Sequence, residues 1–180
     1  TMLARSGWKD RWRIDWGFYQ PILRLAKTRG LSILALNAPG EITRVVSRKG
    51  LDALPASDRA ALPELDLKND SHRAFFRRTM DETKHPLPKD GLERLYTSMV
   101  IWDETMAHHA SEWLKTDKRR KVIIIAGSGH CRNDGTTGRI RRRGIEDVVS
   151  VRPVVVDGPG TIADLLVRPE ADYLWVMTPD

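Results

Sequence analysis

Residues 121–130 read KVIIIAGSGH, and this stretch decides the predicted fold. An unbroken run of β-branched residues, with charged residues before it and glycines after it, is typical of a strand buried on both faces in the middle of a parallel sheet. Gly127 and Gly129 then let the chain turn at the carboxyl end of that strand, where open α/β folds bind their ligands. His130 follows directly, so the sequence predicts a binding site there.

Other apolar stretches extend the predicted sheet. Residues 31–37 form a second apolar strand that brings Asn37 to a strand end. Residues 147–156 and 172–177 are also β-rich, and Pro153 favours an edge position for the first of them. We therefore expect an α/β fold, with a mostly parallel sheet flanked by helices and a small helical subdomain inserted. The expected division places the sheet domain at residues 1–50 and 116–180, and the helical subdomain at residues 51–115.

The longest predicted helix, about Asp90 to Lys115, belongs to that subdomain. Its apolar side chains recur every three or four residues along one seam, as in a helix with one buried face. Asp103 falls within the seam, whereas Glu104 is expected to point away from it. A buried carboxylate must find a partner, so Asp103 marks either a functional site or a structural carboxylate that binds a backbone N–H or an arginine.

Composition limits the class of protein. With 41% hydrophobic and 30% charged residues among 180, the chain has the composition of an ordinary globular protein. Its net charge of +6 suits an anionic partner, but the basic run at 139–143 carries no interleaved aromatic residue, so we expect no nucleic acid. Cys131 is the only cysteine, and we treat it as a bystander.

Several familiar motifs are missing. Arg132 stands where a dinucleotide-binding loop would have its third glycine, and there is no P-loop, His-Glu-x-x-His or Cys-x-x-Cys sequence. His108 and His109 are adjacent on the predicted helix and diverge by about 100°, so they are poorly placed to share a metal ion.

Four blocks carry a resemblance to a known family. They are WGFYQPIL (16–23), ALNAP (35–39), WDETMA (102–107) and AGSGH (126–130). In this order and spacing they resemble the ChaN-type haem-binding uptake proteins of the Tiki superfamily, also called DUF399. The resemblance implies a sheet domain with a smaller helical domain, in a periplasmic or outer-membrane lipoprotein of bacterial iron uptake. Family members carry a first strand and a Gly-Glu-x-His-like motif upstream of the tryptophans, and we expect both, like the lipid anchor, to be absent from this sequence.

The resemblance further implies haem, an iron protoporphyrin, bound between the subunits of a homodimer with a tyrosine as iron ligand. Tyr96 is the first candidate, Tyr19 is the next tyrosine, and His130 is the second choice of ligand. Tyr173 lies in the last strand, where we expect it in the core. The other residues expected at the haem site are Gly129, Asp103, Asn37 and Arg139, and Arg139, Arg141 or Arg142 is expected to meet the propionates.

The preferred function is the sequestering or transfer of haem rather than catalysis. The alternative is a metal-dependent hydrolase of the Tiki type that uses His130 and Asp103. That alternative needs a second histidine near His130, for which His72, His85 and His109 are available. A third possibility is a protein-interaction module that uses an exposed sheet edge.

Overall fold

The structure is a computed structural model that describes residues 2–12, 14–83, 90–156, 159–167 and 170–178. The chain divides into two compact units, Thr1–Ala35 and Leu36–Asp180. His85 lies outside the described residues. Within the described part of the chain, no helix is both long enough and apolar enough to cross a membrane.

The first unit consists of three helices, α1 (Met2–Ser6), α2 (Trp8–Arg11) and α3 (Trp16–Thr28). Asp15 caps α3, because its carboxylate accepts a hydrogen bond of 2.6 Å from the backbone N–H of Gly17. The ring of Trp8 lies 5.1 Å from that of Trp16 and 5.3 Å from that of Tyr19, between ring centres. This unit is therefore held together by a small aromatic cluster.

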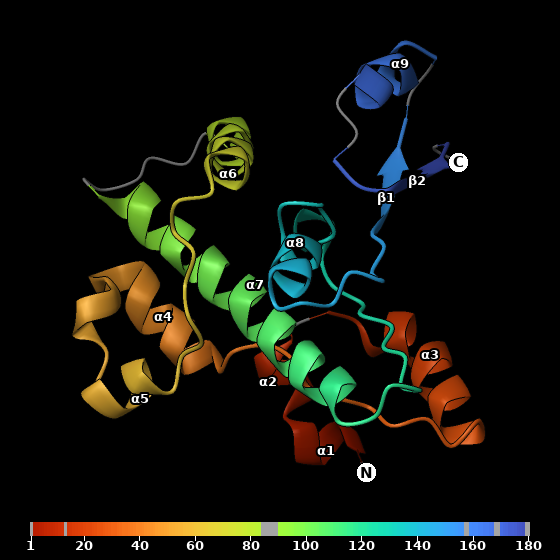
Figure 1. The fold of residues 1–180 in the computed structure, drawn as a ribbon, viewed down its shortest axis with the longest axis horizontal. Coiled ribbons are helices and arrows are strands. Elements are labelled where there is room, and N and C mark those ends of the chain that lie inside the picture. Colours follow the sequence, from red (N-terminus) through yellow and green to blue (C-terminus); the bar gives the residue numbers. More distant parts are fainter. Residues whose placement is uncertain (1, 13, 84–89, 157–158, 168–169, 179–180) are drawn as a thin grey trace. The chain divides into compact units, whose positions relative to one another are not determined.

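The second unit contains the remaining elements (Figure 1). In chain order they are α4 (Gly40–Lys49), the 3₁₀ turn η1 (Leu51–Ala53), α5 (Ala56–Ala60), α6 (Asp70–Thr83), α7 (Gly91–Lys115), the 3₁₀ turn η2 (Ser128–His130), α8 (Thr136–Arg142), β1 (Val151–Val155), α9 (Pro159–Val167) and β2 (Tyr173–Met177). The predicted long helix is confirmed as α7.

Helix α7 is the central element, and α4, α6 and α8 all contact it (Figure 1). Three core clusters follow one another along it. Tyr96 and Val100 pack with Phe76 of α6, Ile101 belongs to a cluster with α4, and Ala107 belongs to a cluster with α8. The buried apolar side chains of α7 are thus divided among three neighbouring helices.

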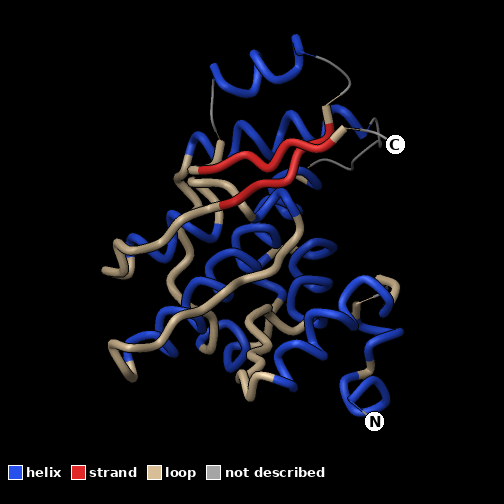
Figure 2. Tube along the Cα trace, turned by 90° about the vertical axis from the view of Figure 1, so that its right-hand side faces the viewer, coloured by secondary structure: helices blue, strands red, loops and turns tan. Residues whose placement is uncertain are grey.

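The sheet consists of β1 and β2, which run parallel and side by side, with Val151 opposite Tyr173 and Val155 opposite Met177 (Figure 2). The α/β prediction therefore holds only in coarse form, as a mostly helical fold with a small parallel sheet. Tyr173 was expected in the core, and this was wrong, because its side chain is 61% exposed.

The stretch 121–126 differs from the prediction. It carries no strand pairing among the described residues, and Ile123 is 89% exposed. Val122 and Ile124 pack against the cluster around Ala107, so only alternate side chains are covered. Burial on both faces is therefore wrong for this segment. Residues 31–36 likewise show no strand pairing, and the division into a sheet domain and a helical subdomain stays a prediction.

Two glycines hold the loop after His130 against α8. A Cβ on Gly135 would lie 2.8 Å from the carbonyl oxygen of His130, and one on Gly138 would overlap the carbonyl oxygen of Asn133. A side chain at either position would therefore push the loop away from the helix.

We predict that Gly138→Ala lowers the free energy of unfolding by about 1–2 kcal/mol, because the overlap outweighs the gain of about 1 kcal/mol in helix propensity. Gly40→Ala is the matched control, since nothing lies within 4 Å of its added Cβ. We expect the control to be unchanged or slightly more stable. Urea unfolding measures both, and a Gly138→Ala protein as stable as Gly40→Ala would contradict this packing.

Candidate functional site

Asp103 of α7 is fully buried and lies at the centre of a polar cluster. Its Oδ1 accepts hydrogen bonds from Nδ1 of His130 and from the hydroxyl of Thr136, both at 2.8 Å. Nε2 of His72 lies 3.0 Å from Oδ2, although neither atom has a well-directed hydrogen bond. Oδ2 of Asp103 and Nε2 of His72 are therefore in close polar contact. Asp103 thus joins α6, α7 and the loop that leads into α8.

His72 is as buried as Asp103, and its neighbours decide which ring nitrogen carries the proton. Nη2 of Arg139 lies 3.4 Å from Nδ1 of His72. Because a guanidinium has no acceptor, Nδ1 must accept, and the proton is assigned to Nε2, which faces Asp103. The hydroxyl of Tyr96 also lies 3.4 Å from Nδ1 and the same distance from the carbonyl oxygen of Asn69, to which it can donate.

His130 is held in the opposite tautomer. Because the Asp103 carboxylate can only accept, Nδ1 of His130 carries a proton, so in the neutral ring the lone pair is on Nε2. Nε2 has no hydrogen-bond partner among the described residues, and the side chain is 18% exposed. Asp103 therefore fixes the ring while the opposite nitrogen stays free to bind a ligand.

Apolar side chains lie near the loop that carries His130. Trp102 lies edge-on to the imidazole, with ring centres 6.0 Å apart. A Cβ on Gly129 would meet Met99 at 3.7 Å and Phe75 at 3.8 Å, so Gly129 lies against these two side chains. The turn itself needs no unusual backbone at Gly127, where φ is −58°.

The pKa of Asp103 is lowered well below its ordinary value. Burial alone raises this pKa, but the hydrogen bond from His130, the contact with His72 and the charge of Arg139 lower it by more. Asp103 is therefore ionised, which agrees with its role as acceptor for both imidazoles.

Glu104 was expected to point away from the core, and this was wrong, because it is fully buried. Its carboxylate binds Nε of Arg139 at 3.1 Å, Nη2 of Arg142 at 2.6 Å and Nη2 of Arg143 at 2.6 Å. Helix α8 supplies Arg139 and Arg142, and Arg143 follows it directly. Because α8 packs on this side of α7, Glu104 is inside the fold.

Four predicted site residues meet around one point. Asp103 binds His130, Gly129 is adjacent in the chain, and Nη1 of Arg139 lies 3.9 Å from Oδ2 of Asp103. Tyr96 reaches the same cluster only through His72, and its side chain is 1% exposed.

Asn37 and Tyr19 were also predicted at the site. Asn37 is exposed, and its side chain accepts a hydrogen bond of 2.8 Å from the N–H of the next residue. Tyr19 belongs to the first unit, where its ring contacts Trp8.

Sequence reasoning named His72 only as one of three histidines available to the hydrolase alternative, and it missed Thr136. His72 precedes Phe76 by four residues and Met80 by eight, so it lies on the apolar stripe of α6, and this spacing could have indicated its burial. Thr136 carried no comparable signal. In the described part of the chain, no group of three or more His, Cys, Asp or Glu side chains is arranged to hold a metal ion.

We predict that Asp103→Asn lowers the free energy of unfolding at pH 7 by about 3 kcal/mol, because it removes the charge that both imidazoles face. The folded pKa of Asp103 lies below its unfolded value of about 3.9, so its contribution is complete above about pH 5 and is lost as the pH falls. The difference between wild type and variant should narrow by up to about 1.4 kcal/mol per pH unit below about pH 4.

Urea unfolding at pH 7 and pH 3 measures both effects. Asp52→Asn is the control, since Asp52 is an exposed carboxylate paired with Arg59, and it should change stability by less than about 1 kcal/mol. A difference between wild type and Asp103→Asn that stays constant down to pH 3 would contradict the assigned ionisation.

One comparison with known proteins, a match to a family model, agrees with the resemblance carried by the four sequence blocks. The family model described as "Haem-binding uptake, Tiki superfamily, ChaN" matches residues 1–140. Neither the curated proteins nor the solved structures contain a match. The family match covers well over half of the 180 residues, and the chain therefore belongs to the ChaN family of haem-binding uptake proteins in the Tiki superfamily.

Proposed function

We propose that this protein binds haem and sequesters or hands it over, without catalysing a reaction. Family membership supports the ligand class. The observation that carries the proposal is His130, whose Nδ1 is bound to a buried carboxylate and whose Nε2 is free. Histidines that ligate metals commonly donate their other ring N–H to a carboxylate, which fixes the ring and raises the basicity of the ligating nitrogen.

The residues around His130 fit an iron porphyrin. An imidazole nitrogen is a common axial ligand of haem iron. Trp102 lies edge-on to the His130 ring, and Phe75 and Met99 supply apolar surface against the adjacent Gly129. In this proposal haem is the molecule that the protein carries, and it brings the iron with it. The chain's own residues orient the imidazole, keep its proton on Nδ1 and offer an apolar flank.

Tyrosine remains the other candidate for the ligand. Burial raises the pKa of the Tyr96 hydroxyl against the opposing charges of Arg73 and Arg139, which disfavours the phenolate that iron requires. The Tyr96 ring also lies in the core beneath α6. We therefore rank His130 first, Tyr96 second and Tyr19, which is partly exposed, third.

The setting proposed for the protein follows from the family resemblance alone. It is bacterial iron uptake by a periplasmic or outer-membrane lipoprotein, with haem bound between the two subunits of a homodimer. Membrane attachment would be through a lipid anchor, and no nucleic acid is involved.

Titration with haemin tests the proposal. We expect a saturable shift of the Soret band for the wild type, and an affinity at least about tenfold weaker for His130→Ala. His109→Ala is the matched control, because His109 is an exposed histidine of α7 that contacts the carbonyl oxygen of Leu36, and it should bind normally.

An unchanged free-haem spectrum with the wild type would remove the proposed function. A Tyr19→Phe/Tyr96→Phe double variant distinguishes the candidate ligands. Full haemin binding by this variant would support His130. Loss of haemin binding in this variant, together with normal binding by His130→Ala, would make a tyrosine the ligand.

One observation favours the alternative of a metal-dependent hydrolase. The second histidine that it requires is present, because His72 and His130 both face Asp103. Calorimetric titration with Zn²⁺ and Mn²⁺, followed by assay on an unfolded polypeptide, tests it. Metal-dependent cleavage that disappears in His72→Ala, while Asp52→Asn cleaves normally, would favour the hydrolase.

A further inference from the structure

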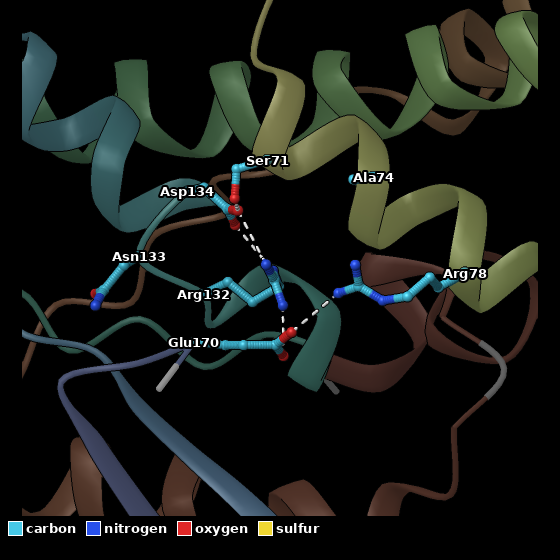
Figure 3. A pocket seen from close by; sticks show the side chains of 7 residues that line it. All are labelled: Ser71, Ala74, Arg78, Arg132, Asn133, Asp134 and Glu170. Atoms are coloured by element: carbon cyan, nitrogen blue, oxygen red, sulfur yellow. Dashed lines mark hydrogen bonds and ion pairs between the residues drawn. The ribbon is translucent and has the colours of Figure 1, made fainter. Parts of the chain in front are cut away.

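Helix α6 and the loop after His130 enclose a surface pocket of about 420 Å³ (Figure 3). It is lined by Ser71, Ala74, Arg78, Arg132, Asn133, Asp134 and Glu170. Arg132 lies in the middle of the lining, between Asp134 and Glu170, and Arg78 reaches across from α6 to the same glutamate (Figure 3). None of these residues belongs to the Asp103 cluster, so the pocket is a separate feature.

The lining carries two arginines, Arg78 and Arg132, and two carboxylates, Asp134 and Glu170, but these charges are unevenly paired. Asp134 binds Arg132 through two parallel contacts, of 2.8 Å to Nε and 2.9 Å to Nη2. Glu170 is shared among three guanidinium groups: Arg78 at 3.3 Å, Arg132 and Arg152. With Arg152, which binds Glu170 from outside the pocket lining, three arginines share these two carboxylates, and Glu170 alone serves all three.

Arg132 already binds Asp134 through Nε and Nη2, so its Nη1 is the part that an incoming anion would satisfy. Its side chain is 4% exposed, and its Nη1, which faces Glu170, has no well-directed hydrogen bond. Leaving part of a buried cation without a hydrogen bond is costly, and arginine prefers a carboxylate that it can bind through two parallel hydrogen bonds. Glu170 cannot give that geometry to three partners at once.

The pocket adjoins His130 through Phe75. The guanidinium carbon of Arg132 lies 3.9 Å from the centre of the Phe75 ring, and the edge of the same ring lies 3.8 Å from the Cβ position of Gly129. One aromatic side chain thus connects the charged pocket with the loop that carries His130. A ligand with an apolar ring and a carboxylate could contact both.

The arginines first expected to meet such a carboxylate are already occupied. Arg139 and Arg142 bind Glu104, and Arg141 binds Asp172 at 3.0 Å. Arg78 differs from them, because its side chain is more than half exposed and has a single long contact with Glu170.

We propose that this pocket is a carboxylate-binding site, in which Arg78 and Arg132 bind the incoming carboxylate and Glu170 is the internal group that it displaces. Assigning that carboxylate to a haem propionate rests on the proposed function. The carboxylate site itself does not, because it is argued from charge and geometry alone.

The first test compares haemin with its dimethyl ester, in which both propionates are masked. Arg78→Gln should weaken haemin binding about tenfold, because it removes one charge-assisted contact with a propionate. It should leave the affinity for the ester unchanged. Arg77→Gln is the matched control, since Arg77 precedes Arg78 on α6, is equally exposed and pairs with Glu93 outside the pocket. Glu170→Gln removes the competing charge and should strengthen haemin binding several-fold.

The second test uses propionate ion without haem. In an NMR titration of the wild type with propionate up to roughly 100 mM, we expect saturable shifts of the backbone amide signals of Asn133 and Glu170. These shifts should be smaller in Arg78→Gln. Sodium chloride at equal ionic strength controls for screening.

The two tests separate the two proposals. No saturable shift with propionate, or equal loss of haemin and ester affinity in Arg78→Gln, would overturn the carboxylate site. Propionate shifts that are lost in Arg78→Gln, together with an unchanged haemin spectrum, would support the site and remove the haem function.

Discussion

The buried carboxylate of Asp103 is the interaction on which this fold and its site depend. It sits on the central helix, and its partners come from three other places in the chain: His72 from α6, His130 from the turn η2, and Thr136 from the start of α8. A charge buried in this way is stable only while its hydrogen-bonding partners stay in place. The same contacts that make the burial tolerable therefore fix the orientation of two imidazoles.

The two histidines on Asp103 are not equivalent. His72 is fully enclosed, with Arg139 and Tyr96 on its far side, so both of its nitrogens face protein groups. His130 is bound to the cluster through Nδ1 only. Trp102 lies edge-on to its ring, and Phe75 and Met99 lie against the neighbouring Gly129. The enclosed histidine supports the carboxylate, and the partly exposed one is left to meet a ligand.

Sequence reasoning found the parts of this arrangement that short-range patterns encode. The seam of α7 identified Asp103 as buried, and the turn after the apolar run identified His130. It could not predict the burial of Glu104, because whether a helix face is buried depends on which element packs against it. Here that element is α8, which begins 32 residues after Glu104. The same reason explains residues 121–126: an apolar run does not reveal how many of its faces are covered. The side chain of Ile123 is exposed although the residues beside it are packed.

The account's central claim is that Asp103 holds His130 with the proton on Nδ1 and leaves Nε2 free. Nitrogen-15 NMR of the histidine rings tests it most directly, because the chemical shift of each ring nitrogen shows whether it carries a proton. We expect the neutral His130 ring to carry its proton on Nδ1 and to have an unprotonated Nε2, and this pattern should change in Asp103→Asn. A His130 ring with its proton on Nε2, or one unaffected by that substitution, would contradict the account.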